Sequence, residues 1–249
     1  WQPMKMIARM YLYASYEEQR MKHQVILPPP HLSTYVRHFW TIDFDGISEH
    51  DSTFCVFARR YPRLVFQHHN GNSAIYNGAD KLPISYISGL NSRPYVCGIQ
   101  PRISITGVSF YPSAIKLLFG VDSVELVNEL PDLVNFVPRA WIDQVLDAVT
   151  QAERIQLLIA HLSKKIAGAK ADAVAQFGWQ RVGSSTEYSL IKDLRDLFHV
   201  SERQLVRTFR ATVGMSPKQF LRITRFEKSI ELMHRGKHDQ SDLTHALGY

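Results

Sequence analysis

Residues 189–214 read SLIKDLRDLFHVSERQLVRTFRATVG, and this stretch decides how the C-terminal part of the chain is interpreted. Its first half places three leucines on one face of a predicted helix: Leu190, Leu194 and Leu197. His199-Val200 then predicts a short turn. Ser201 begins a second helix, because Ser201 and Gln204 form the Ser-x-x-Gln pattern of a capping box. Helix, short turn and capped helix together are typical of a helix-turn-helix unit.

The second helix of this unit has two different faces. Leu205 and Phe209 are four residues apart and predict the face that packs on the core. Arg203, Arg207 and Arg210 share a face turned away from that anchor. Solvated arginine faces are common, but a short helix with one packed face and one arginine face also fits a DNA major groove. The helix-turn-helix context favours DNA binding.

The net charge of the chain is concentrated near its C-terminus. The 249 residues carry a formal charge of +6. Residues 1–150 are neutral, residues 151–176 contribute +2, and residues 177–249 contribute +4. A basic C-terminal segment is consistent with a polyanionic partner, although a solvated basic surface is an equal explanation of charge alone.

The remaining pattern divides the chain into a β-rich part and a helical part. Between residues 24 and 110, short apolar runs alternate with Pro, Gly and Asn, which predicts a small β-sandwich or barrel. The predicted strands are 24–27, 36–44, 53–58, 63–67, 84–89 and 103–110. The predicted helices are 112–120, 141–149, 154–168, 173–181, 188–198, 201–212, 217–234 and 241–247. The fold class is therefore α+β.

Four segments follow from these patterns. Residues 1–20, which start with Trp1, are taken as an extension, since Met21 precedes the first patterned strand. Residues 21–150 form the β-rich regulatory domain, residues 151–171 a helical connector with a linker at Gly168–Asp172, and residues 172–249 the helical domain.

A weak internal repeat extends the helical domain. LRDLFHV at 194–200 aligns with LTHALGY at 243–249, so a second unit begins near the end of the sequence without its recognition helix. Between the units, Ser216-Pro217 predicts a helix start. The helix that follows is expected to bury one stripe: Phe220, Ile223, Ile230 and Met233. With only one complete helix-turn-helix unit, the chain is expected to bind DNA weakly.

These motifs resemble the DNA-binding domain of the AraC/XylS family of bacterial transcription regulators. The resemblance rests on SERQLVRTFR (201–210), VGMSPKQFLRITRF (213–226) and ALGY (246–249). Three N-terminal segments resemble, less specifically, the first domain of one AraC subgroup: PHLSTYVRHFWTID (30–43), ISGLNSRPYV (87–96) and GVSFYPSAIKLLFG (107–120).

The resemblance implies a regulator that binds promoter DNA, often under the control of an effector or of dimerisation through its first domain. It places Arg203, Val206 and Arg207 in the major groove and assigns Arg210, Ser216 and Lys218 to the phosphate backbone. The effector is unidentified, and helix 154–168 is a candidate dimer surface. No cofactor, metal or membrane partner is expected, and the expected location is the bacterial cytoplasm, at the nucleoid.

Other chemistry finds little support in the sequence. His68-His69 could suggest a metal, but neighbouring strand residues point to opposite faces, so an ordinary hydrogen-bonded pair is favoured. Cys55 and Cys97 lie among apolar residues and are expected to be inert thiols. His161 is expected to be structural. Four aromatic residues are expected in the core rather than in a pocket: Tyr35, Phe39, Trp40 and Phe44.

Two alternatives stay open at this stage. One is a β-barrel that binds a small molecule or catalyses a reaction, with a helical tail that binds another protein. The other is a DNA repair protein that accepts alkyl groups on Cys55 or Cys97. The first predicts a tightly bound small ligand and no salt-dependent DNA binding, and the second predicts a covalently modified Cys55 or Cys97.

Overall fold

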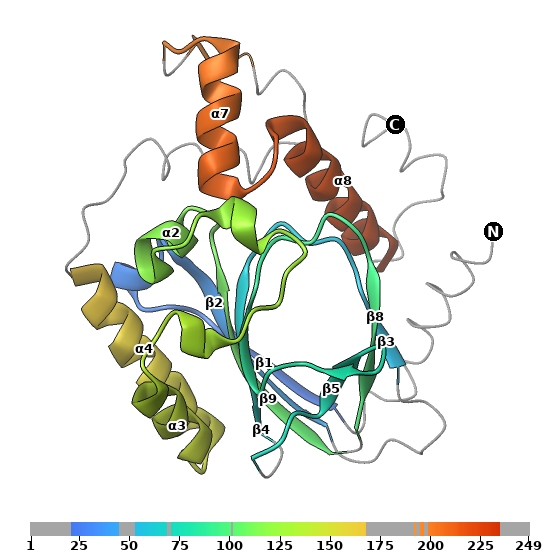
Figure 1. Ribbon diagram of the computed structural model, residues 1–249, viewed down its shortest axis with the longest axis vertical. Helices are drawn as coiled ribbons and strands as arrows, with labels where there is room; N and C mark the ends of the chain where they lie inside the picture. Colours follow the sequence, from blue (N-terminus) through green and yellow to red (C-terminus); the bar gives the residue numbers. More distant parts are fainter. Residues whose placement is uncertain are drawn as a thin grey trace.

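The computed structural model describes residues 21–44, 53–68, 71–100, 102–167, 192, 195–196 and 199–234. Nine strands come first and most of the helices follow, so the predicted α+β class is confirmed (Figure 1). The predicted extension (1–20), linker (168–172), helices near 173–181 and 241–247, and second helix-turn-helix unit lie outside the described residues.

Two antiparallel sheets build the N-terminal part. The five-stranded sheet has the order β1-β2-β9-β4-β7, with β1 Met21–Ile26, β2 Val36–Phe44, β9 Ile103–Phe110, β4 Arg63–His68 and β7 Ser85–Ser88. The four-stranded sheet has the order β3-β8-β5-β6, with β3 Thr53–Val56, β8 Tyr95–Ile99, β5 Ile75–Asn77 and β6 Asp80–Lys81. All six predicted strands are present, and β5, β6 and β8 are additional.

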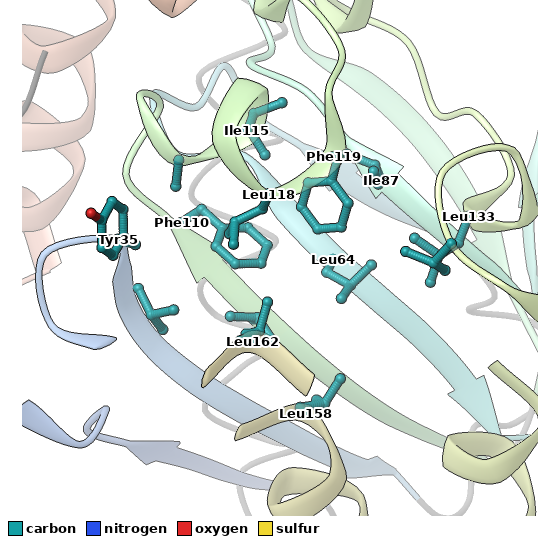
Figure 2. Packing of buried hydrophobic residues seen from close by; sticks show 14 of the residues in the cluster. Tyr35, Leu64, Ile87, Phe110, Ile115, Leu118, Phe119, Leu133, Leu158 and Leu162 are labelled. Atoms are coloured by element: carbon teal, nitrogen blue, oxygen red, sulfur yellow. The ribbon is translucent and has the colours of Figure 1, made fainter. Parts of the chain in front are cut away.

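The outer face of the five-stranded sheet packs on helices. These elements are η1 (Pro30–Leu32), α2 (Ala114–Phe119), η2 (Ser123–Leu126), η3 (Leu133–Asn135), α3 (Arg139–Asp147) and α4 (Gln151–Ala167). Leu64 of β4 and Phe110 of β9 contribute to one buried cluster with Leu158 and Leu162 of α4, as Figure 2 shows. Each fully buried side chain of this size contributes about 1.5–3 kcal/mol to stability. The apolar face of α4 is therefore part of this core.

The inner face of the same sheet is turned toward the second sheet. Trp40 and Val65 lie on it because side chains alternate along a strand, and they pack with Ile75 and Cys97 of the other sheet. The Trp40 ring lies against Gly107 of β9, where an added Cβ would fall 2.2 Å from the ring. The four named aromatic residues are buried, as predicted, but Trp40 also lines a cavity between the two sheets.

Two long helices make up the described C-terminal part: α7 (Glu202–Val213) and α8 (Pro217–His234). Their bounds confirm the predicted helices 201–212 and 217–234 to within one residue. The predicted stripe of α8 is only partly right, since Phe220 and Ile223 are buried, Ile230 is half-buried and Met233 is 41% exposed. No helix in the described residues has both the length and the apolar character to cross a bilayer.

Candidate nucleic-acid interface

The turn that precedes α7 has the backbone geometry predicted from His199-Val200. His199 takes a left-handed φ of +50°, and the N–H of Val200 donates to the carbonyl of Arg195 at 3.2 Å. A left-handed residue with this six-residue hydrogen bond is a Schellman motif, which ends a helix. The chain therefore turns sharply before α7 begins.

Both long helices have serine N-caps. The backbone N–H of Gln204 donates to Ser201 Oγ at 3.2 Å, which supplies one half of the predicted capping box. The complete reciprocal box lies at the next helix, where Gln219 N–H donates to Ser216 Oγ and Ser216 N–H donates to Gln219 Oε1. The Ser-Pro-Lys-Gln pattern in the sequence could have identified this second box.

The two faces of α7 separate as predicted. Leu205 and Phe209 are buried in a cluster with Phe220 of α8, whose ring meets that of Phe209 edge-on at 5.7 Å. Arg203, Arg207 and Arg210 are exposed. Among the described residues, no carboxylate lies within ion-pair distance of these three guanidinium groups. Within the described part of the chain, the arginine face is thus a cationic surface without an ion-pair partner.

The other predicted contact residues differ in accessibility. Val206 is half-buried at the edge of the arginine face, and Lys218 is exposed in the first turn of α8. Ser216 is half-buried, and its hydroxyl and backbone N–H both bond to Gln219. Three residues separate α7 from α8, so Ser216 and Lys218 follow closely on the end of the arginine helix.

The C-terminal end of α7 rests on the N-terminal domain. Ser123 Oγ of η2 donates to the carbonyl of Thr212 at 2.8 Å. Gly214 follows with φ +92°, and an added Cβ there would fall 2.6 Å from the carbonyl oxygen of Ser123. Figure 1 shows α7 standing on this segment with its other end directed away from the sheets. The half of α7 that carries Arg203 and Arg207 is therefore left accessible.

Helix α8 is held against the loop between β3 and β4. Arg60 Nε lies 2.6 Å from Glu227 Oε2, and the Arg60 backbone N–H donates to Glu227 Oε1 at 3.0 Å. Phe57 packs on Phe226 with ring centroids 5.9 Å apart. Leu90, which follows β7, is a buried member of the cluster formed by α7 and α8. The helical pair thus completes its core with residues of the N-terminal domain.

The Arg60–Glu227 ion pair is expected to stabilise the contact between the domains. Its side chains are only 14% and 24% exposed, so removal of one partner leaves a poorly solvated charge. Arg60→Met or Glu227→Gln should each lower the free energy of unfolding by about 1–3 kcal/mol. In a double-mutant cycle measured by denaturant unfolding, the coupling should be at least about 1 kcal/mol.

The exposed pair Arg139–Asp143 on α3 is a matched control, since its side chains are 64% and 46% exposed. Its coupling should be about 0.3–0.5 kcal/mol. Equal coupling energies for the two pairs would show that Arg60 and Glu227 do not secure α8.

The structure also bears on the metal and thiol alternatives. His68 bonds to Thr106 Oγ1 at 3.2 Å, and burial next to Arg154 lowers its pKa to about 4; His69 lies outside the described residues. No group of three metal-ligating side chains occurs among the residues that are described. Burial raises the pKa of Cys97 to about 11 and also raises the pKa of Cys55, which is opposite to the shift that activates a thiol.

His161 packs flat on Trp141, with ring centroids 3.9 Å apart. Burial, together with Lys165, lowers its pKa to about 4, so the ring is neutral at pH 7. A neutral stacked imidazole between α4 and α3 fits the structural role expected for this histidine.

A polar cleft of about 920 Å³ lies between the five-stranded sheet and helices α3 and α4. Gln151 dominates it: its amide donates to Asp43 Oδ1 at 3.0 Å and to Ser104 Oγ at 2.9 Å, and it accepts from Thr106. These hydrogen bonds tie Gln151, the first residue of α4, to β2 and β9 of the five-stranded sheet.

Comparisons with known proteins give remote matches. The model of a domain of unknown function, DUF6597, matches residues 24–132, which is less than half of the chain. A structure of ToxT from Vibrio cholerae has 10% identity and a TM-score of 0.43, with 92% of this chain and 90% of that chain covered. Wild-type ToxT from strain SCE256 with a bound unsaturated fatty acid has 12% identity and a TM-score of 0.41, with coverages of 92% and 87%.

The AraC-like transcriptional activator CuxR is more distant, with 10% identity, a TM-score of 0.26, and coverages of 87% and 89%. No curated protein sequence gave a significant match. At these identities and TM-scores, similarity does not assign a family, and the function must be inferred from the residues of this chain.

Proposed function

We propose that this protein is a DNA-binding transcription regulator of the AraC/XylS type, which inserts α7 into the major groove. The observation that carries the proposal is the row of exposed arginines on a capped helix after a sharp turn, with no carboxylate of the described residues within ion-pair distance of them. An unpaired cationic face is poorly explained by stability, because it only adds repulsion to the folded state.

The positions of the contact residues decide which of them we assign to base contacts and which to phosphate contacts. Arg203 and Arg207 lie one helical turn apart in the accessible half of α7, where each could bind guanine O6 and N7 with its planar fork. Val206 lies between them and could contact a thymine methyl. Arg210 and Lys218, farther along, are assigned to phosphates. The hydroxyl of Ser216 is already bonded within the cap of α8, so Ser216 is assigned to a phosphate contact made by the N-terminal end of that helix.

The N-terminal domain is proposed to control DNA binding by α7 and α8. Its segments at Arg60, Leu90 and Ser123 contact α7 and α8 directly, so a change in that domain can alter how the helices are held. An effector or dimerisation would supply the change. The protein is proposed to act in the bacterial cytoplasm, at the nucleoid, and to have no catalytic activity.

The test is the binding of the protein to a random-sequence DNA duplex pool over a salt series, followed by selection of a preferred site. Affinity should fall steeply with salt, with a slope of log K against log salt near −0.9 per phosphate neutralised. Selection should then enrich one sequence. Salt-independent binding, or binding without enrichment of one sequence, would contradict sequence-specific DNA binding by this protein. Absence of binding even at low salt would favour a helical pair that binds protein.

A further inference from the structure

The polar cleft between the five-stranded sheet and helices α3 and α4 is large enough for a small molecule. Its volume of about 920 Å³ lies within the range of about 300–1,000 Å³ that is usual for ligand sites. Three paired residues on neighbouring strands line one side: Asp43 of β2 is paired with Ser104 of β9, and Ser104 is paired with His68 of β4. The last turn of α3 and the first turn of α4 line the other side, with Asp147 and Arg154.

Asp43 and Arg154 carry opposite charges but do not form an ion pair with each other. Ser104 Oγ lies between them, since it donates to Asp43 Oδ1 at 2.6 Å and accepts from Arg154 Nη1 at 3.4 Å. Arg154 is 9% exposed, and no carboxylate of the described residues lies within ion-pair distance of its guanidinium. A desolvated guanidinium without an ion pair is stabilised by an anion that enters the cleft.

Each of these two charged groups has one atom that bonds to no described residue. Arg154 Nε donates to the carbonyl of Ala148 at 3.0 Å and Nη1 donates to Ser104, whereas Nη2 has no described acceptor. Asp43 Oδ1 accepts from Ser104 and from Gln151, whereas Oδ2 has no described donor. A single hydroxyl separates the two groups, and a single carbon separates the carboxylate from the ammonium of an α-amino acid. The pair therefore fits such a zwitterion.

A third charge, Asp147, lies where α3 ends. Asp147 is exposed and forms no hydrogen bond or ion pair with the described residues. A carboxylate at the C-terminal end of a helix is repelled by the helix dipole, so helix stability does not explain its position. Arg139 and Asp143, which also line the cleft, pair with each other at 2.8 Å. The described lining thus contains three aspartates and two arginines, an imbalance that a ligand with an additional cation would neutralise.

We propose that this cleft binds a basic α-amino acid such as lysine or arginine. Arg154 Nη2 donates to its carboxylate, Asp43 Oδ2 accepts from its α-ammonium group, and Asp147 binds its side-chain cation. A flat aromatic ligand is disfavoured, since the described lining contains no Phe, Tyr or Trp on which it could stack. The proposal does not rest on the DNA-binding function, because the residues concerned all belong to the N-terminal part of the chain.

The test is isothermal calorimetry of the protein without DNA against L-lysine and L-arginine, each with two analogues. At least one of the two amino acids should bind. Lysinamide and argininamide lack the carboxylate and should bind at least about tenfold more weakly, because a hydrogen bond between charged groups at a buried arginine is lost. Norleucine and citrulline lack the side-chain charge and should bind at least about threefold more weakly, since an exposed ion pair contributes less.

Asp147→Asn should remove the preference for a charged side chain and leave the preference for the carboxylate. Asp147 is exposed and has no partner among the described residues, so this variant is expected to fold. Glu125→Gln is the matched control, because Glu125 is an exposed acid on η2 that does not line the cleft. It should leave all affinities unchanged.

No measurable binding of either amino acid at millimolar concentration would overturn the proposal, as would equal affinity of each amino acid and either of its analogues. Neither result requires a variant to fold. A preference for a charged side chain that Asp147→Asn leaves intact would overturn the assignment to this cleft. Because no DNA is present, failure of these titrations is distinct from failure of the proposed DNA binding.

Discussion

Replacing Arg203 and Arg207 together by alanine should weaken binding to a selected DNA site by at least about thirtyfold. Each side chain is expected to contribute 1–3 kcal/mol of base contact, and both are exposed on the same face of α7. Fluorescence anisotropy with a labelled duplex at fixed salt measures the loss. Stability should stay within about 0.5 kcal/mol, because neither side chain has a partner among the described residues.

Two control variants separate base reading from general charge. Arg139→Ala removes an exposed arginine on α3 and should leave affinity unchanged at moderate salt. Lys218→Ala should weaken all sequences alike and reduce the salt slope by about 1, as expected for a phosphate contact. If the double arginine variant retained full affinity and site preference, α7 would not be the reader.

Replacing Gly214 by alanine should destabilise the protein by more than about 3 kcal/mol. Gly214 has φ +92°, which costs an L-residue about 1–2 kcal/mol by itself, and its Cβ would meet the Ser123 carbonyl at 2.6 Å. Backbone atoms cannot move aside like a flexible side chain, so η2 and α7 must separate. Thermal and denaturant unfolding measure the effect.

Gly120→Ala is the matched control for this substitution. Gly120 also ends a helix with a left-handed φ, +72°, but an added Cβ there meets nothing within 4 Å. Its cost should be limited to the backbone term of about 1–2 kcal/mol. Similar losses for both variants would show that the approach of η2 to Gly214 does not matter for stability.

The sequence predicts helices α7 and α8 accurately because their signals are local. A serine cap, an apolar spacing of three to four and a following glycine or proline act within a few residues of one another. The missed strands have no such signal. β5 and β6 contain three and two residues, and β8 includes Gly98, so their extended form depends on pairing with one another.

Burial along α8 also could not be predicted fully from local sequence signals. Phe220 and Ile223 are buried because α7 and Leu90 cover them, whereas Met233, in the same helical register, is 41% exposed. Periodicity identifies a face that can pack, but the neighbouring elements decide how far along the helix it is covered.

The sequence by itself determined the α+β class, six of the nine described strands, the helical pair and the face of α7 that carries its arginines, since these depend on local pattern. Only the tertiary structure brought Arg60 to Glu227, Ser123 to Thr212, and Asp43, Ser104 and Arg154 to one cleft. These residues are far apart in the chain, and no periodicity or short motif links them. Their proximity follows from how the two sheets pair and which segments the helices cover.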